Sequence, residues 1–132
     1  MTVIDSSSLA KYVNREPGWE SVEDQLRRGV ATIPLALKEI SNTLWKRVRE
    51  KQLSKEFSCK VLEGLIKLKP FKVLDQETAL STALDISVEE NLPIYDAIFI
   101  ALSEKMREPL ITSDVKQAEA AKRRKLQVFY IP

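Results

Sequence analysis

The stretch LPIYDAIFIALSEK, residues 92–105, places six apolar residues, AIFIAL, directly after Asp96. Their side chains cover more than one face of any helix that they form, so this helix should be buried on nearly all sides. An ionised carboxylate beside such a helix costs several kcal/mol unless a cation compensates it. The fold must therefore enclose residues 92–105 and account for the charge of Asp96.

The rest of the chain alternates short apolar runs with longer helical patterns. Five apolar runs predict short strands, and they are TVID (2–5), VATI (30–33), FKVL (71–74), EPLIT (108–112) and QVFYI (127–131). Helical patterns separate the runs, over residues 6–13, 18–28, 34–52, 54–67, 76–91, 93–106 and 114–125. This alternation indicates an α/β fold in which a parallel sheet of about five short strands is sandwiched by helices.

Length and composition fit a single domain that spans residues 1–132. The chain is 44% apolar and 30% charged, and its net charge is only +2. No apolar run approaches the ~20 residues of a membrane span, so we expect no membrane association. The first residues, MTVIDSSS, lack the basic and apolar regions of a signal peptide, which predicts a cytoplasmic protein.

Two features of the composition restrict the chemistry. Cys59 is the single cysteine, which excludes an internal disulfide and any metal site made of several cysteines. The sequence contains no histidine, which excludes histidine-based triads, histidine general bases and most zinc or copper sites. Any catalysis must therefore use carboxylates, lysines, serines or a hard metal ion.

Four acidic residues follow predicted strands or open the helices beyond them. Asp5 closes the first strand, and Asp114 follows the fourth. Glu39 lies early in the helix after the second strand, and Asp96 lies in the first turn of the 93–106 helix. In a parallel sheet these places lie toward the edge formed by the carboxyl ends of the strands, where α/β proteins form their sites. We therefore expect the four carboxylates to meet.

Each acid also has a purely structural explanation. Asp5 and Asp114 could cap helices, and Asp114 has capping-box spacing to Gln117. Asp96 is favoured by the helix dipole, and Glu39 is a good helix former. Asp96 is the hardest to explain in this way, because it precedes a buried helix and a serine or threonine would cap that helix without a charge.

Carboxylates gathered at one place repel each other, and some of them become protonated unless a cation is present. A divalent ion removes this difficulty, and an oxygen-only ligand set selects Mg²⁺ or Mn²⁺ over zinc. Such an ion can activate water for attack on a phosphodiester. The basic stretches 45–55 and 122–125 would then hold phosphates, although each also fits a solvated helix face laced with ion pairs.

Four segments carry a resemblance to a known family, namely VIDSSSLAKYV at the start, LALKEISNTLWK around Glu39, LPIYDAIFIALSEK around Asp96 and PLITSD before Asp114. In their order and spacing they resemble the PIN-domain ribonucleases, specifically the small VapC-type toxins of prokaryotic toxin–antitoxin pairs. The resemblance covers essentially the whole chain. It implies a PIN-like parallel sheet sandwiched by helices.

The resemblance also implies an acidic catalytic pocket, made of Asp5, Glu39, Asp96 and Asp114. Of these, Asp5, Asp96 and Asp114 would bind Mg²⁺ or Mn²⁺, with Glu39 as a further candidate ligand and no other cofactor. Two hydroxyl residues would support the pocket by hydrogen bonds, namely Ser6 and Thr112. As implied by the family, the protein would cleave RNA, work as a homodimer and be silenced by a cognate antitoxin.

The sequence departs from the family pattern at one place. Many relatives carry a further acid or Asn shortly after the position of Asp114, where this chain has Lys116 and Gln117. The next acid, Glu119, would lie about 140° around the helix from Asp114, so it is a poor candidate ligand. This leaves open whether one or two metal ions bind.

Two other functions remain open from the sequence. An Asp-based phosphatase or phosphoacceptor domain also places an aspartate after its first parallel strand, but Ser7 stands where such a phosphatase needs a second acid. A degenerate domain could bind RNA or protein without cutting it. Trp19 and Trp45 could stack on bases but are interpreted as core or interface residues, and Tyr95 is interpreted as a packing residue. Residues 18–28 and 34–67 are interpreted as a dimer or antitoxin surface.

Overall fold

Five short strands form one parallel sheet in the order β3-β2-β1-β4-β5. The structure, a computed structural model, describes residues 1–132. The strands are β1 (Thr2–Ile4), β2 (Val30–Thr32), β3 (Lys72–Val73), β4 (Leu110–Thr112) and β5 (Val128–Tyr130). Every predicted strand is present, and each is one or two residues shorter than its apolar run. The predicted α/β fold with a parallel sheet is therefore confirmed.

Seven α-helices connect and cover the strands. They are α1 (Ser6–Val13), α2 (Trp19–Arg28), α3 (Pro34–Arg49), α4 (Lys55–Leu68), α5 (Leu80–Glu90), α6 (Ile94–Met106) and α7 (Val115–Arg123). The helix predicted over residues 76–91 begins with a separate 3₁₀ turn, η1 (Glu77–Ala79). None of the helices combines the length and the apolar character that crossing a membrane requires.

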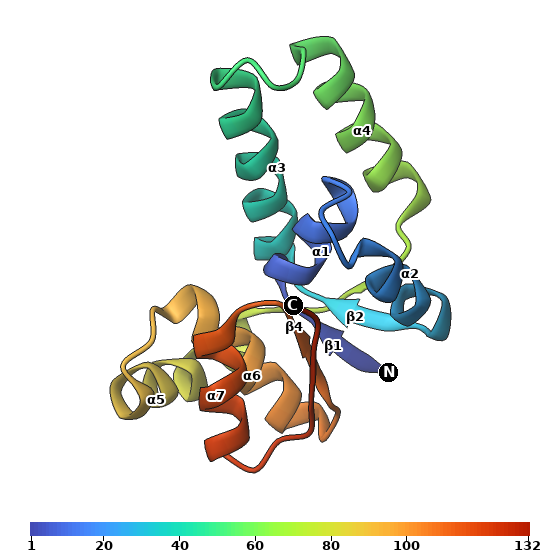
Figure 1. Ribbon diagram of the computed structural model, residues 1–132. Helices are drawn as coiled ribbons and strands as arrows, with labels where there is room; N and C mark the ends of the chain where they lie inside the picture. Colours follow the sequence, from blue (N-terminus) through green and yellow to red (C-terminus); the bar gives the residue numbers. More distant parts are fainter.

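The helices lie in two layers, one on each face of the sheet. In Figure 1, α1, α3 and α4 lie above the sheet, whereas α5, α6 and α7 lie below it. The chain moves from β1 outward to β2 and β3, and then returns to pair β4 with the other side of β1. Right-handed crossovers place the helices of the outward and return paths on opposite faces. The strand order therefore reverses between β1 and β4.

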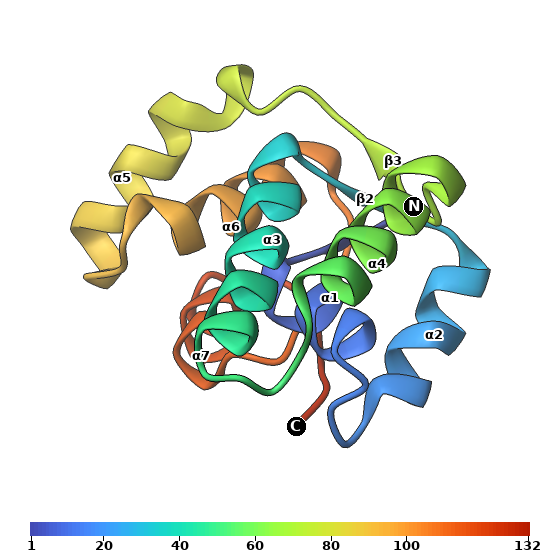
Figure 2. The ribbon, with the colours of Figure 1, turned by 90° about the horizontal axis from the view of Figure 1, so that it is seen from above.

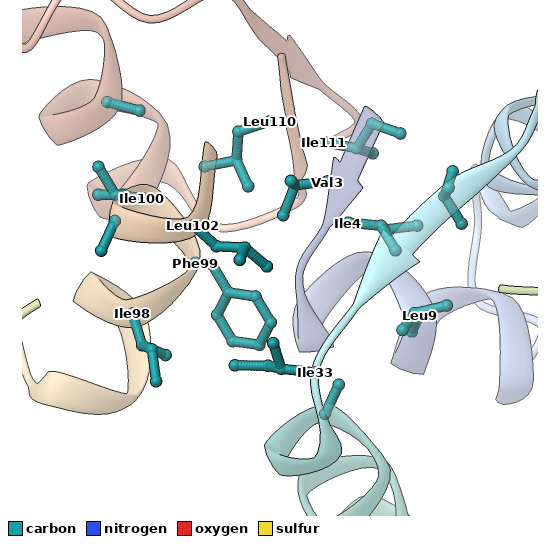
Figure 3. Close-up of a cluster of buried hydrophobic side chains, with 14 of the residues drawn as sticks. Val3, Ile4, Leu9, Ile33, Ile98, Phe99, Ile100, Leu102, Leu110 and Ile111 are labelled. Atoms are coloured by element: carbon teal, nitrogen blue, oxygen red, sulfur yellow. The ribbon is translucent and has the colours of Figure 1, made fainter. Parts of the chain in front are cut away.

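Helix α6 is the centre of the core, as the apolar run predicted. All residues from Ala97 to Ser103 are buried. Figure 3 shows Phe99 pointing toward Ile33, with Val3 beside the same cluster. Because α6 is enclosed on all sides, its first turn is held at the carboxyl edge of the sheet.

Helices α3 and α4 form a hairpin that extends away from the sheet (Figure 1), and Figure 2 shows the two helices side by side. Pro34 occupies the first turn of α3, where its missing N–H costs no hydrogen bond. At the start of α4, the Ser54 side chain accepts a hydrogen bond from the Phe57 N–H at 3.1 Å. Helix α3 thus begins just after β2 and extends from there away from the sheet.

Candidate active site

A pocket of about 560 Å³ opens at the carboxyl edge of the sheet, where the strand order reverses between β1 and β4. This is the place where open α/β sheets usually bind their ligands. Residues of α1, α3, α6 and α7, together with two helix-capping aspartates, line the pocket. The four predicted acids are all among them, and we call Asp5, Glu39, Asp96 and Asp114 the carboxylate pocket.

Asp5 is the deepest of the four acids, with 2% of its surface exposed. It caps α1 by accepting the Ser8 N–H at 3.0 Å, and both of its carboxylate oxygens accept the Ser7 hydroxyl at 2.8 Å. The Thr112 hydroxyl donates to its Oδ2 at 2.5 Å. Burial raises the pKa of Asp5 to about 6, because the loss of hydration outweighs these hydrogen bonds, and the charge of Asp114 raises it further.

Asp96 is half-buried, and its carboxylate forms no hydrogen bond or ion pair within the protein. Burial raises the pKa of Asp96 to about 6, and the neighbouring charges of Asp114 and Glu39 add to this effect. The charge that the sequence placed beside a buried helix therefore has no cation partner in the chain itself. It faces other carboxylates instead.

The other two acids accept hydrogen bonds from a serine hydroxyl and from a backbone N–H. The Ser6 hydroxyl donates to Glu39 Oε1 at 2.6 Å, which joins α1 to α3 at the pocket. Asp114 caps α7 by accepting the Gln117 N–H at 2.9 Å. Both predicted supporting hydroxyls, those of Ser6 and Thr112, thus bond to a carboxylate of the pocket.

The sequence did not assign a role to two residues that order the pocket. Ser7 bonds to both oxygens of Asp5 and also accepts the Ser113 N–H at 2.9 Å, so it connects the ends of β1 and β4. Gln117 is 2% exposed, and its Nε2 donates to the backbone carbonyl of Asp96 at 2.8 Å. A full capping box is therefore absent, because the Gln117 side chain reaches α6 rather than the Asp114 N–H.

Three residues with free polar or aromatic groups complete the rim, namely Lys38, Lys46 and Tyr95. Tyr95 is 57% exposed, so the interpretation of Tyr95 as a packing residue is wrong. Trp45 is also exposed, and the Arg49 guanidinium lies 4.6 Å from its ring centroid. Trp19, by contrast, packs against Tyr12, in agreement with the sequence.

The basic stretch 122–125 does not border the carboxylate pocket. It lies at the carboxyl end of α7, whereas Asp114 is at the amino end of that helix. Arg123 pairs with Glu90 at 2.7 Å, and Arg124 pairs with Glu104 at 2.5 Å. Of the two basic stretches that we expected to hold phosphates, only 45–55 reaches the pocket, through Lys46.

The chemistry of the carboxylate pocket fits a hard divalent cation. Its candidate ligands are all oxygens, and burial, together with the charges of neighbouring carboxylates, raises the pKa of Asp5 and of Asp96. As placed, no three acidic side chains converge closely enough to hold one ion together. Asp5, Glu39 and Asp114 each turn an oxygen toward a serine, threonine or backbone donor. Glu119 is exposed and outside the pocket, as expected.

Comparisons with known proteins agree with this fold. A family profile described as the PIN domain matches residues 2–123. Ribonuclease VapC3 of Pyrobaculum aerophilum is 31% identical over 120 residues, which cover 89% of this chain and 92% of the relative.

Two solved structures have a similar fold. PAE2754 from Pyrobaculum aerophilum has a TM-score of 0.73 and 23% identity, covering 90% of this chain and 83% of its own. VapBC2 from Rickettsia felis, crystallised with a DNA fragment from its promoter, has a TM-score of 0.70 and 15% identity, covering 99% and 98%. At these identities the likeness shows the fold alone.

Proposed function

The chain belongs to the PIN-domain family and is homologous to the VapC ribonuclease toxins of toxin–antitoxin systems, and from this premise we propose that it is a metal-dependent endoribonuclease. One observation carries the proposal. Four carboxylates from separate segments of the chain meet at one pocket, and no lysine or arginine pairs with any of them. A site of this kind attracts a divalent cation.

In the proposed mechanism Asp5, Asp96 and Asp114 hold Mg²⁺ or Mn²⁺, with Glu39 as a further ligand. The ion, when bound, supplies a water-derived nucleophile and charge stabilisation for hydrolysis of an RNA phosphodiester. Ser7 and Thr112 fix the orientation of the Asp5 carboxylate through their hydroxyl donors. The pocket must be deprotonated to bind a cation, so the raised pKa values of its acids predict weaker activity below about pH 6.

The geometry disfavours the alternative of an Asp-based phosphatase. A nucleophilic aspartate must present a free oxygen to the phosphorus atom. Asp5 is 2% exposed, which suits the ligand of a small ion but leaves little room for the phosphorus atom of a substrate at its carboxylate. Such a phosphatase needs a second acid two residues after its nucleophile. This chain has Ser7 at that position, and the Ser7 hydroxyl donates to Asp5 itself. The presence of all four acids at one pocket argues against a non-catalytic binding domain.

We propose in addition that the protein is a cytoplasmic toxin, that a cognate antitoxin silences it and that it forms a homodimer. Homology to the VapC toxins supports the first two parts. Exposed apolar side chains offer surfaces for both partners, on α4 at Phe57 and Ile66 and on α5 at Leu84 and Val88. The α5 surface lies outside the two segments that the sequence indicated. Light scattering coupled to size-exclusion chromatography tests the dimer.

The experiment that tests the function is cleavage of a labelled single-stranded RNA by the purified protein. We expect cleavage in Mg²⁺ or Mn²⁺, no cleavage in EDTA, and loss of cleavage in Asp96→Asn. Glu119→Gln, which removes an equal charge outside the pocket, serves as the matched control and should cleave normally. Full activity of Asp96→Asn would remove the metal-site assignment. Hydrolysis confined to small phosphomonoesters would support the phosphatase instead.

A further inference from the structure

One face of α3 lines the pocket and extends beyond it. Lys38, Asn42 and Lys46 follow each other at intervals of four residues, so their side chains lie in one row along the helix. All three are exposed, and all three border the same cavity as the carboxylates. The row is about 12 Å long at the rise of an α-helix. It follows α3 from the carboxyl edge of the sheet toward the free end of the hairpin (Figure 1).

Neither lysine of this row is paired. The salt bridges of the structure include neither Lys38 nor Lys46, although four carboxylates line the same cavity. No side-chain hydrogen bond restrains their ammonium groups either. These two lysines form no ion pair that would stabilise the fold, so their ammonium groups are available to bind a negatively charged ligand. A chain of phosphates is such a ligand.

Tyr95 gives the pocket an exposed aromatic surface. It precedes Asp96 in the first turn of α6 and lines the same cavity, yet it is 57% exposed. Its neighbours on the core side, from Ala97 onward, are buried, so the ring lies at the boundary between the core and the pocket. An exposed ring beside a phosphate site suits a nucleobase, because every base offers a flat π-face. In a duplex those faces are already stacked, so the ring selects a single strand.

We propose that single-stranded RNA enters the pocket along α3, with Lys38 and Lys46 holding successive phosphates, Asn42 between them and one unstacked base on Tyr95. This inference rests on the proposed ribonuclease function and adds the residues that position the substrate. Lys38 and Lys46 are positioning residues for the backbone, so they act on every sequence alike. Tyr95 acts on the base next to the carboxylates.

The lysine part is tested by the salt dependence of RNA binding. The dissociation constant of a fluorescent single-stranded RNA is measured by anisotropy in EDTA at several NaCl concentrations. These run from about 50 to 200 mM, because the affinity falls steeply with salt over this range. Each phosphate contact contributes about 0.7 to the slope of log K against log salt. The double variant Lys38→Gln/Lys46→Gln should therefore lower the slope by about 1.4. The matched control Lys60→Gln/Lys67→Gln removes two exposed lysines of α4 that lie outside the basic stretch 45–55 and should keep the wild-type slope.

The tyrosine part is tested by a different readout. Tyr95→Leu should weaken binding to single-stranded RNA roughly 5- to 100-fold with no change in salt slope, because a stacked base releases no counterions. Tyr95→Phe keeps the ring and should bind like the wild type. Binding to double-stranded RNA should be the same in all three proteins.

The outcomes separate this inference from the function on which it rests. If the wild-type protein cleaves RNA in Mn²⁺ but the two lysine variants have equal salt slopes, the proposed entry path is wrong and the ribonuclease function still holds. Equal KM values for the two lysine variants in Mn²⁺ would overturn the entry path in the same way. A wild-type protein that neither binds nor cleaves RNA overturns both. Equal binding by Tyr95→Leu and Tyr95→Phe overturns the stacking.

Discussion

The carboxylate pocket and the carboxyl end of α7 differ in whether their charged side chains have partners of opposite charge. At the end of α7, three glutamates and two arginines form what we call the α7 ion-pair cluster, namely Glu89, Glu90, Glu104, Arg123 and Arg124. Every member of this cluster has a partner of opposite charge within 2.7 Å. In the carboxylate pocket, four acids lie around one cavity and none has such a partner.

The titration behaviour of the two regions follows from this difference. The hydrogen bond from Arg124 to Glu104 raises the pKa of the guanidinium further above its usual range, so the charged form is favoured. In the pocket, desolvation raises the pKa of Asp5 and of Asp96, so the charged form is disfavoured. One region pairs its charges within the chain, whereas the acids of the other have no partner of opposite charge. Removing a charge should therefore have different consequences in the two regions.

The largest effect should come from removing a pocket charge. Asp114→Asn keeps an oxygen that can accept the Gln117 N–H, so α7 remains capped. It removes a proposed metal ligand, which should lower kcat/KM for RNA about 100- to 1000-fold. Glu89→Gln makes the same kind of change in the α7 ion-pair cluster and should leave kcat/KM nearly unchanged. Similar losses in both variants would show that the two regions do not differ in function.

The second prediction concerns stability in the presence of metal. A ligand at one hundred times its Kd stabilises the folded state by about 3 kcal/mol, so saturating Mn²⁺ should raise the melting temperature by several degrees. Asp96→Asn should abolish this shift, because the pocket loses a ligand and a charge. Glu104→Gln, in the α7 ion-pair cluster, should respond to Mn²⁺ like the wild type. Differential scanning fluorimetry with and without EDTA gives both comparisons, and a shift retained by Asp96→Asn would place the ion elsewhere.

The third prediction uses pH without metal. Since the folded-state pKa of Asp5 is raised to about 6, the folded protein binds more protons than the unfolded chain between about pH 4 and 6. The ionised Asp5 thus destabilises the fold above pH 6, and this penalty disappears as the pH falls toward 4. Asp5→Asn should stabilise the metal-free protein by about 1 to 3 kcal/mol at pH 8 and by little at pH 4. Urea unfolding at pH 8 and at pH 4 checks this. If Asp5→Asn does not raise the free energy of unfolding at pH 8, the charge of Asp5 is already balanced in the folded protein.

The elements of the fold could be predicted because their signals are local. The run AIFIAL indicated a helix buried on all sides, and α6 is buried from Ala97 to Ser103. The acids were predicted to meet because Asp5 and Asp114 follow parallel strands, and such strands end at one edge of the sheet. Both predictions need only the sequence pattern and a general rule.

The remaining features depend on contacts between distant segments. Ser7 accepts the Ser113 N–H only because β4 pairs with β1 across more than one hundred intervening residues. Gln117 reaches the Asp96 carbonyl only because α7 packs beside α6. The exposure of Tyr95 was mispredicted for another reason, since an apolar helix has no polar face from which its rotation could be inferred.

The smallest effect should come from breaking the α7 ion-pair cluster. Arg124→Met leaves Glu104 and Glu89 without their partner. The Glu89 side chain is 63% exposed, so water screens the loss of that pair, whereas the pair of Arg124 (21% exposed) and Glu104 (25%) is partly buried. We expect a destabilisation of about 1 to 2 kcal/mol in urea unfolding, and a double-mutant cycle with Glu104→Gln isolates the pair. RNA cleavage by Arg124→Met should match the wild type, because this arginine neutralises glutamates of its own chain. A loss of cleavage with unchanged stability would return residues 122–125 to the role that the sequence indicated, as a site for phosphates.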